Sequence, residues 1–379
     1  MPPSGALPVR EIGKLFRILA VASLISVRQA FLGLFQHRIG SYAYKVNIYG
    51  PVLRYVFERV SESHRRALGQ PATSRETIRR YCRKHALDLH VQKASEHASL
   101  FWIGKPPRGP SSKILLYFHG GGYYHSIQPS HIRFLQQCIS QAPAPVSLAI
   151  LEYTLTTQAP WPAQLRCAVS ATAHLLKDYS PSQIILGGDS AGGHLALGLL
   201  SHILHPDQSP CNDEKIELAE PFAGAFLISP WVTVSTSAPS YTRLANRDHL
   251  TIGRVERFTQ KLTASDGPYS LEKLSADPFL SPLNAPEGWW ACLGSAVGKL
   301  QLAVGTWEIF FDDNCAMARM LRKDAKGTDL SLSECAYAIH SGSVVDAALG
   351  IRNSTMSRAV WSWLNSVLGQ NQTAGSTSC

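Results

Sequence analysis

The chain has 379 residues, and residues 188–192 read Gly-Asp-Ser-Ala-Gly directly after the apolar run 184–186. This pattern predicts a strand that turns sharply into a helix, with Ser190 exposed at the turn. The turn closes only where the neighbouring residues are small, as are Gly188, Ala191 and Gly192. A serine hydroxyl reacts well only when it is held beside a base. We therefore take Ser190 as the candidate nucleophile. The alternative is a tight glycine-rich turn without chemistry.

Apolar runs typical of buried strands alternate with helical patterns from residue 113 to residue 368. The predicted strands lie at 113–119, 146–153, 183–187, 224–229, 300–305 and 330–339, and the helices at 162–179, 190–204, 312–323 and 356–368. Such alternation is typical of a mainly parallel sheet with helices on both faces. The predicted fold class is therefore α/β, with one large domain that carries additions.

Composition changes along the chain divide it into four predicted parts. They are a hydrophobic and basic segment at 1–36, a helical N-terminal cap region at 37–110, the catalytic domain at 111–368 and a disordered tail at 369–379. Within the catalytic domain, residues 232–299 interrupt the alternation and are rich in Ser, Thr, Pro and aromatic residues. A long insertion between core strands is where a lid would lie.

The formal charge of +9 comes from the N-terminal part, because residues 1–112 hold 18 Lys and Arg against 6 Asp and Glu. A basic region can indicate nucleic acid, an anionic membrane surface or a solvated face. The sequence has no nucleic-acid-binding signature, so we expect no nucleic-acid partner. The solvated face is favoured over a polyanion partner.

Residues 10–35 predict a basic, apolar helix. The longest uncharged stretch, Ile18–Val27, has ten residues, whereas a spanning helix needs about 20. Arg10, Lys14, Arg17 and Arg28 fall within one sector of such a helix, as in a helix that lies on a membrane. Packing over the main domain is the alternative. Without a small-residue cleavage site, an intracellular location, membrane-associated through this helix, is favoured over secretion.

The eight cysteines form no Cys-x-x-Cys pair and no zinc-like cluster with histidine. In a chain of this length they are more typical of free thiols than of a disulfide framework. We expect neither a metal ion nor an organic cofactor. The oligomeric state is left open.

A second glycine-rich motif, 119–122, reads His-Gly-Gly-Gly and ends the apolar run 113–118. Acyl transfer builds negative charge on a carbonyl oxygen, which preplaced N–H groups stabilise. The predicted oxyanion-hole donors are the amides of Gly121, Gly122 and Ala191. His119 and Gly120 are expected to shape this loop. A phosphate cradle is the alternative, but the sequence has no P-loop or dinucleotide-binding pattern.

The motifs at 119–122 and 188–192 together resemble those of the hormone-sensitive-lipase-like branch of the α/β-hydrolase superfamily. The segment between them supports this resemblance, because it reads Tyr-Thr-Leu at 153–155 and Pro-Trp-Pro-Ala at 160–163. The resemblance covers residues 113–368 and implies an α/β-hydrolase fold with a cap region. The N-terminal extension is similar in general character to that of fungal steryl-acetyl-hydrolase-like proteins.

The resemblance implies a Ser-acid-His order along the chain. It assigns the acid to Glu308, where the family usually has Asp, with Asp312 and Asp313 as alternatives that would otherwise cap the next helix. The base is His340, which follows the last predicted strand. Asp189 is implied to order the turn around the nucleophile and has no expected catalytic role.

These features predict a serine esterase that needs no cofactor. We expect the substrate to be a small hydrophobic ester, with a short acyl group such as acetyl on a bulky hydrophobic alcohol. Three alternatives remain open: a hydrolase for one dedicated intermediate of secondary metabolism, an amidase or arylformamidase, and a non-catalytic ligand receptor on the same fold. Proteins of the last kind generally lose the serine or the histidine of the triad.

Overall fold

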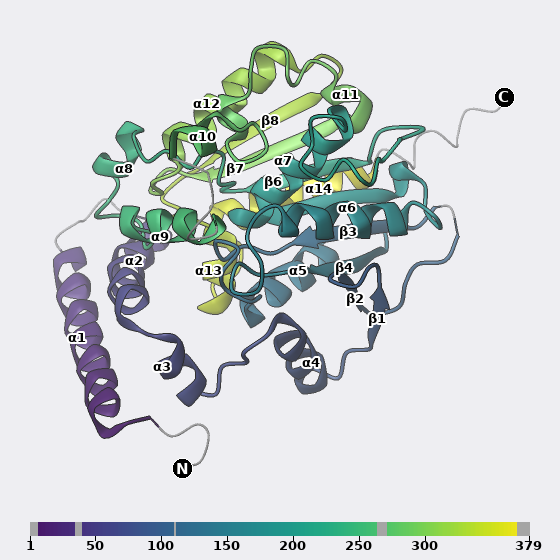
Figure 1. Cartoon of the computed structure of the whole chain (residues 1–379). Helices are drawn as coiled ribbons and strands as arrows, with labels where there is room; N and C mark the ends of the chain where they lie inside the picture. Colours follow the sequence, from purple (N-terminus) through teal and green to yellow (C-terminus); the bar gives the residue numbers. More distant parts are fainter. Residues whose placement is uncertain (1–6, 35–39, 110, 264–270, 370–379) are drawn as a thin grey trace.

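The computed structural model describes residues 7–34, 40–109, 111–263 and 271–369. An eight-stranded sheet crosses the described part of the molecule in the order β1-β2-β4-β3-β5-β6-β7-β8 (Figure 1). The pairs from β4 to β8 are parallel, whereas β1 with β2 and β2 with β4 are antiparallel. This arrangement confirms the predicted α/β fold with a mainly parallel sheet.

The strands are short and, in the middle of the sheet, apolar on both faces. Their bounds are β1 Leu89–Lys93, β2 Ser99–Ile103, β3 Lys113–Phe118, β4 Val146–Glu152, β5 Ile184–Asp189, β6 Gly224–Ile228, β7 Lys299–Gly305 and β8 Asp329–Cys335. Central parallel strands must be apolar throughout because helices cover both of their faces. The last strand ends at Cys335, so that His340 lies in the loop that follows it.

Eleven of the described helices connect the strands, precede the sheet or follow it. They are α1 Val9–Leu34, α2 Ser41–Arg59, α3 Glu62–Ala67, α4 Ser74–Lys84, α5 Pro129–Ser140, α6 Ala163–Leu175, α7 Ala191–Leu204, α9 Ile252–Leu262, α12 Phe311–Asp324, α13 Gly342–Ala348 and α14 Thr355–Gly369. Shorter helical segments are α8 Pro239–Arg243, α10 Leu271–Ala276, α11 Leu293–Ala296, η1 Pro181–Gln183 and η2 Pro282–Asn284.

The sheet separates two apolar layers. On one face, Leu116 and Leu186 pack with side chains of α6, α7 and α12. On the other face, Leu115 and Ile185 pack with side chains of α4, α5 and α14. Neighbouring residues of a strand point to opposite faces, so the strands supply both layers. Replacing a core leucine with alanine typically costs about 2–5 kcal/mol. Because the two packed layers hold the strands in place, they also fix the positions of the loops at the carboxyl ends of the strands.

The region 37–110, predicted to be helical, also contains strands. Its first part forms α2, α3 and α4, but residues 89–93 and 99–103 form β1 and β2. These two strands join the central sheet through the pairing of β2 with β4. The prediction of a mainly helical region did not include these two strands, because the edge strand β1 is polar and largely exposed and lacks a buried-strand pattern.

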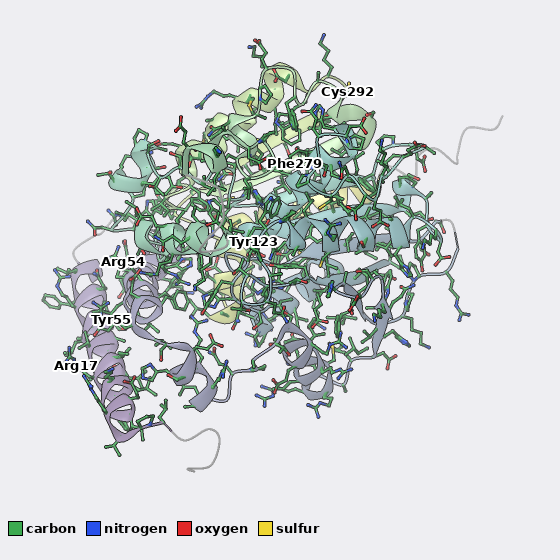
Figure 2. The ribbon with its side chains drawn as sticks, viewed as in Figure 1. Arg17, Arg54, Tyr55, Tyr123, Phe279 and Cys292 are labelled. Carbon is green, nitrogen blue, oxygen red and sulfur yellow. The ribbon has the colours of Figure 1, made fainter. Side chains whose placement is uncertain are left out.

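The N-terminal helix α1 has one main neighbour, α2, beside which it lies at the edge of the molecule (Figure 1). By length and composition, its residues Val9–Gly33 are the one candidate membrane span among the residues that the structure describes. Only 11% of the most apolar window is buried. Large apolar side chains are exposed along it, including Phe16, Leu24 and Phe31. Figure 2 shows Arg17 on this helix; Tyr123, also labelled there, is fully buried.

The segment 232–299 contains α8 to α11 and η2, and its described part contains no strand before β7, which begins at the last residue of the segment, Lys299. Its helix α9 begins after Thr251, whose hydroxyl accepts a hydrogen bond from the N–H of Arg254 at 3.3 Å. The predicted tail lies almost entirely outside the described residues. Seven cysteines are described, and all are free thiols.

Candidate active site

Ser190 lies at the turn between β5 and α7. Its φ of +53° is a strained backbone conformation for a residue with a side chain. The turn needs glycine at position 192, two residues after Ser190, because a Cβ atom on Gly192 would lie 1.9 Å from the carbonyl oxygen of Phe118. The end of β3 and the start of α7 therefore approach closely enough to hold the Ser190 side chain in a fixed position.

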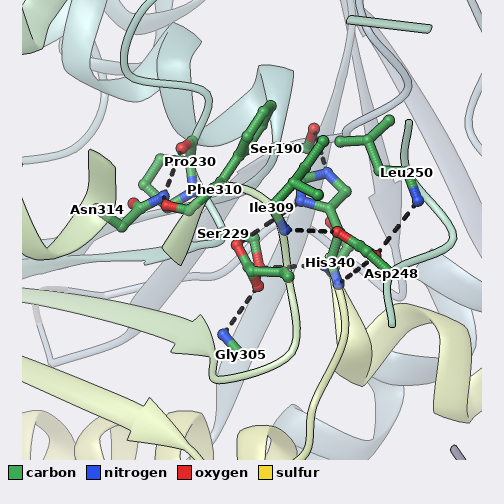
Figure 3. A network of polar contacts seen from close by, with 12 residues as sticks. Ser190, Ser229, Pro230, Asp248, Leu250, Gly305, Ile309, Phe310, Asn314 and His340 are labelled. Carbon is green, nitrogen blue, oxygen red and sulfur yellow. Dashed lines mark hydrogen bonds and ion pairs between the residues drawn. The ribbon is translucent and has the colours of Figure 1, made fainter. Parts of the chain in front are cut away.

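His340 lies beside Ser190. Its Nε2 atom is 2.8 Å from the Ser190 Oγ atom, within hydrogen-bonding distance (Figure 3). The ring of Phe310 packs edge-on against the imidazole, with the ring centroids 4.8 Å apart. Although residues 190 and 340 are far apart in the sequence, β5 and β8 deliver both to the carboxyl edge of the sheet.

Glu308 lies on the far side of His340, at the end of β7. Its Oε1 atom faces the His340 Nδ1 atom at 3.8 Å, within ion-pair distance, and both atoms are buried without a hydrogen-bond partner in the described structure. Its Oε2 atom accepts hydrogen bonds from the Ser229 hydroxyl at 2.6 Å and the Gly305 N–H at 2.8 Å. Catalytic hydrogen bonds are often long in a free enzyme and shorten in the substrate complex.

The two alternative acids have other contacts. Asp312 accepts a hydrogen bond from Arg243 at 2.7 Å near the molecular surface. Asp313 lies near Tyr241, and burial raises the pKa of Asp313 to about 7. Since Glu308 is the one of the three whose carboxylate faces the ring of His340, the geometry favours Glu308.

Asp248 is a fully buried carboxylate that sequence reasoning missed. Its Oδ1 atom accepts hydrogen bonds from the N–H groups of His340 at 3.1 Å and His249 at 2.7 Å. Its Oδ2 atom accepts one from the N–H of Ile309 at 2.9 Å. Asp248 thus ties the backbone of the base to the residue after Glu308 (Figure 3). No local motif marks it, because it lies in the irregular segment 232–299 and acts through contacts with distant residues.

The charges around His340 favour its protonated form. Burial lowers the pKa of His340, but the carboxylates of Glu308 and Asp248 outweigh this effect, so the pKa is raised above its ordinary value. Burial raises the pKa of Glu308, and the neighbouring imidazole offsets this only in part. A histidine that accepts a proton from a serine hydroxyl needs this stabilisation of its cation.

The His119–Gly122 loop lies next to Ser190. Gly121 and Gly122 have φ values of +120° and +61°, which favour glycine. A Cβ atom on Gly122 would lie 2.4 Å from the ring of Phe258 in α9. In the described part of the chain, the amides of Gly121, Gly122 and Ala191 have no protein acceptor. They are thus free to bind a substrate oxygen.

Asp189 orders the parts of the site around the nucleophile. Its Oδ1 atom accepts hydrogen bonds from the N–H of Gly120 and the hydroxyl of Tyr117, both at 2.8 Å. Its Oδ2 atom accepts one from the hydroxyl of Ser341 at 3.1 Å. Burial opposes its ionisation, but His131 and these donors outweigh burial and hold the pKa of Asp189 at about 2.

His119 is buried away from Ser190. Its Nδ1 atom lies 2.8 Å from the carbonyl oxygen of Gly120, and its ring stacks on Tyr153. The Tyr153 hydroxyl donates to the His119 carbonyl at 2.7 Å. Burial lowers the pKa of His119 to about 4, so the ring is neutral near pH 7. These contacts agree with a role in shaping the loop.

An apolar cavity of about 330 Å³ opens at Ser190 and His340. Its size is in the range of small-molecule sites. Its walls combine the core of the fold with the N-terminal helices, since Leu15 and Leu19 come from α1 and Phe57 from α2. Among the described residues, no group of three or more His, Cys, Asp or Glu side chains could hold a metal ion.

Comparison with known proteins agrees with this fold. A model of the alpha/beta hydrolase fold family matches residues 115–342. An acetyl-hydrolase from Streptomyces hygroscopicus is 27% identical over 282 residues, which cover 73% of this chain and 77% of that protein. Human hormone-sensitive lipase is 30% identical over 109 residues, which cover 27% of this chain and 10% of that protein.

Solved structures show the same fold. The crystal structure of an esterase/lipase from an uncultured bacterium superposes with a TM-score of 0.62 and 21% sequence identity. The superposition covers 87% of this chain and all of the bacterial chain. At this identity the likeness concerns the fold.

Proposed function

Because the chain belongs to the alpha/beta hydrolase fold family, in its hormone-sensitive-lipase-like branch, we propose that it hydrolyses carboxylic esters through a Ser190-Glu308-His340 triad. The 2.8 Å separation between Ser190 Oγ and His340 Nε2 is the observation that carries this proposal. Carboxylesterase-type hydrolases are the relatives of this chain, and a nucleophile with its base in reach is what their chemistry requires.

In the proposed acylation step, His340 Nε2 takes the proton of Ser190 while Oγ attacks the ester carbonyl. The amides of Gly121, Gly122 and Ala191 stabilise the oxyanion that forms. Glu308 orients the imidazole and stabilises its cation. The imidazolium then gives its proton to the leaving alcohol. Water, deprotonated by His340, releases the acid and restores Ser190.

The proposed substrate is a short-chain ester, such as an acetate, of a bulky hydrophobic alcohol. The apolar walls of the cavity support a hydrophobic alcohol. The similarity to a protein named as an acetyl-hydrolase, over most of both chains, supports a short acyl group. The amide alternative is separated from the ester proposal by comparing an aryl acetate with the matching acetanilide.

The proposed cap of this enzyme combines the N-terminal helices with the segment 232–299. Phe57 of α2 and Phe258 of α9 both line the cavity. Phe258 also packs on Gly122 of the proposed oxyanion hole. A cap built in this way would cover the ester and exclude water from the reacting atoms.

We further propose that α1 binds a membrane surface inside the cell. The support is its long apolar sequence, its exposed apolar side chains and its low burial. Flotation of the full-length protein with vesicles that contain phosphatidylserine tests this proposal. The protein should float with the vesicles, and its complete recovery in the soluble fraction would contradict the proposal.

The central experiment compares the full-length protein with its Ser190→Ala variant. The unchanged protein should hydrolyse p-nitrophenyl acetate and butyrate and react with a fluorophosphonate probe. Ser190→Ala should lose both activities. Equal labelling of the two proteins would contradict Ser190 as the nucleophile. A failure on every ester from acetate to octanoate would contradict the esterase proposal.

A further inference from the structure

One end of the active-site cavity is cationic. Arg65 of α3, His125 after the glycine loop and Arg254 of α9 all line the cavity, and we call them the Arg65–His125–Arg254 cluster. An Arg65 Nη1 atom lies 3.2 Å from His125 Nδ1, and an Arg254 Nη2 atom lies 3.5 Å from His125 Nε2. The imidazole is therefore held between two guanidinium groups.

This arrangement leaves donors without acceptors. Burial and the two arginines lower the pKa of His125 to about 3, so the ring is neutral near pH 7. A neutral imidazole accepts a hydrogen bond at one nitrogen and carries a hydrogen on the other. His125 can thus satisfy one arginine but not both. Each guanidinium also has several N–H groups that His125 cannot reach.

The carboxylates nearest to the cluster are engaged elsewhere. Glu58 contacts Arg257 at 3.5 Å and also accepts a hydrogen bond from Thr251. Glu62 faces Arg66 at 3.8 Å. In the described part of the chain, neither Arg65 nor Arg254 forms an ion pair with a carboxylate. Glu62 and Glu58 attract the charges of Arg65 and Arg254 from beyond ion-pair distance. Half-buried charges without an ion-pair partner cost free energy, which a ligand of opposite charge would recover.

The cluster lies close to the reacting groups. The N–H of His125 donates to the carbonyl oxygen of Gly121 at 2.9 Å. The Arg254 guanidinium lies over the ring of Phe258, 5.5 Å from its centroid, and Phe258 packs on Gly122. One molecule in the cavity can therefore reach both Ser190 and the cluster.

We propose that the Arg65–His125–Arg254 cluster binds an anionic group, a carboxylate or a phosphate, on the non-reacting part of the ester. The proposal rests on the esterase function above and narrows its substrate class to amphipathic esters with an acidic end. A guanidinium matches carboxylate and phosphate oxygens with paired N–H donors. The apolar walls between the cluster and Ser190 would hold the hydrophobic middle of such a substrate.

A purely structural role is the competing explanation. Arg254 also lies over Phe57, with its guanidinium 5.2 Å from the ring centroid, and so contacts both α2 and α9. Such contacts between a cation and an aromatic ring stabilise the fold. A structural role would lower the activity toward all esters alike, whereas an anion subsite discriminates between charged and neutral esters.

The test compares 8-acetoxyoctanoate with 8-acetoxyoctanamide, which match in length and shape but differ in charge. The corresponding 6-carbon and 10-carbon pairs vary the distance between the ester and the charged end. A further compound, 8-acetoxyoctyl phosphate, separates phosphate from carboxylate recognition. Released acetate is measured with the full-length protein. At one or more lengths, an anionic ester should have at least about a tenfold higher kcat/KM than the amide, in keeping with hydrogen bonds to charged groups.

The variants assign this preference to the cluster. Arg65→Gln and Arg254→Gln should each reduce the ratio of anionic to neutral kcat/KM about tenfold, and Arg254→Lys should keep a preference in the same direction. Arg322→Gln is the matched control, because Arg322 is exposed on α12, away from the residues that line the cavity, and should leave the ratio unchanged. Melting temperatures establish that each variant is folded.

Some outcomes overturn the inference, and others separate it from the esterase proposal. Equal kcat/KM for charged and neutral esters at every length overturns it, as does an equal loss on both esters in the Gln variants. If p-nitrophenyl acetate is still hydrolysed, the esterase proposal stands in either case. If no ester is hydrolysed, calorimetry with octanoate and octanamide decides the subsite, and equal affinities overturn it.

Discussion

Asp189 and Ser341 are joined by a hydrogen bond across the active site, from the Ser341 hydroxyl to the Asp189 Oδ2 atom at 3.1 Å. Asp189 precedes the proposed nucleophile, and Ser341 follows the proposed base. Because Asp189 also binds the N–H of Gly120, one carboxylate connects the nucleophile turn, the glycine loop and the histidine loop. The relative positions of Ser190 and His340 thus depend on a residue that takes no part in proton transfer.

The change Asp189→Asn should destabilise the fold by about 2 kcal/mol near pH 7, from the difference between a pKa of about 2 and the usual value for aspartate. A lowered pKa means that the carboxylate stabilises the fold fully above pH about 4 and loses this effect as the pH falls toward about 2. Urea unfolding of both proteins across this range measures the effect.

The difference between the two proteins should shrink below pH about 4. Asp178→Asn is the control, because Asp178 is exposed, and it should unfold like the unchanged protein at every pH. A constant difference between unchanged protein and Asp189→Asn down to pH 2 would show that ionisation of Asp189 contributes nothing.

Substitution of the proposed acid should lower kcat far more than substitution of its neighbour. Glu308→Gln is expected to reduce kcat for p-nitrophenyl acetate by about 10²–10⁴-fold, because the imidazole loses the charge that stabilises its cation. Asp312→Asn, which breaks the contact with Arg243, should change kcat less than about threefold. The reverse order of effects would assign the acid to Asp312.

The pH dependence of kcat/KM should report the raised pKa of His340. The base must be neutral to accept a proton, so activity should rise with pH and level off above an apparent pKa that exceeds the usual histidine value of about 6.5. Loss of Glu308 removes the largest stabilisation of the imidazolium. The residual activity of Glu308→Gln should therefore level off at a lower pH. An unchanged profile would contradict the pairing.

Gly120 should tolerate no side chain. A Cβ atom there would lie 2.3 Å from the Asp189 Oδ2 atom and 2.8 Å from the Asp189 carbonyl oxygen. Gly120→Ala should therefore displace the glycine loop and lower kcat/KM by about tenfold or more, with a lower melting temperature. At Gly298 a Cβ atom would meet nothing within 4 Å, so Gly298→Ala should behave like the unchanged protein. Full activity of Gly120→Ala would mean that the loop adapts.

The central fold could be predicted because its signals are local. The run 113–118 is apolar throughout, and the turn around Ser190 needs small residues at fixed spacing, so both leave a pattern in a short window of sequence. The edge strand β1 leaves no such pattern, because its side chains are mostly exposed and it pairs only with β2. Its place in the sheet depends on a partner.

The proposed site divides in the same way. Ser190 and the glycine loop carry motifs, whereas Glu308 and His340 were implied by the family resemblance and by their positions after strands. Asp248 and Arg254 were missed, since each matters through contacts made across the fold. Asp248 reaches the N–H groups of Ile309 and His340, and Arg254 reaches His125. The spacing of these residues in the sequence does not indicate the contacts.

The helix α1 supplies Leu15 and Leu19 to the wall of the cavity while much of its remaining apolar surface is exposed. A shortened chain that begins after this helix, the usual remedy for poor solubility, would lack part of the surface that surrounds the ester. Such a chain should accept a broader range of esters than the full-length protein. More water should also reach its cavity. The same 26 residues of α1 should therefore affect both the solubility of the protein and its substrate specificity.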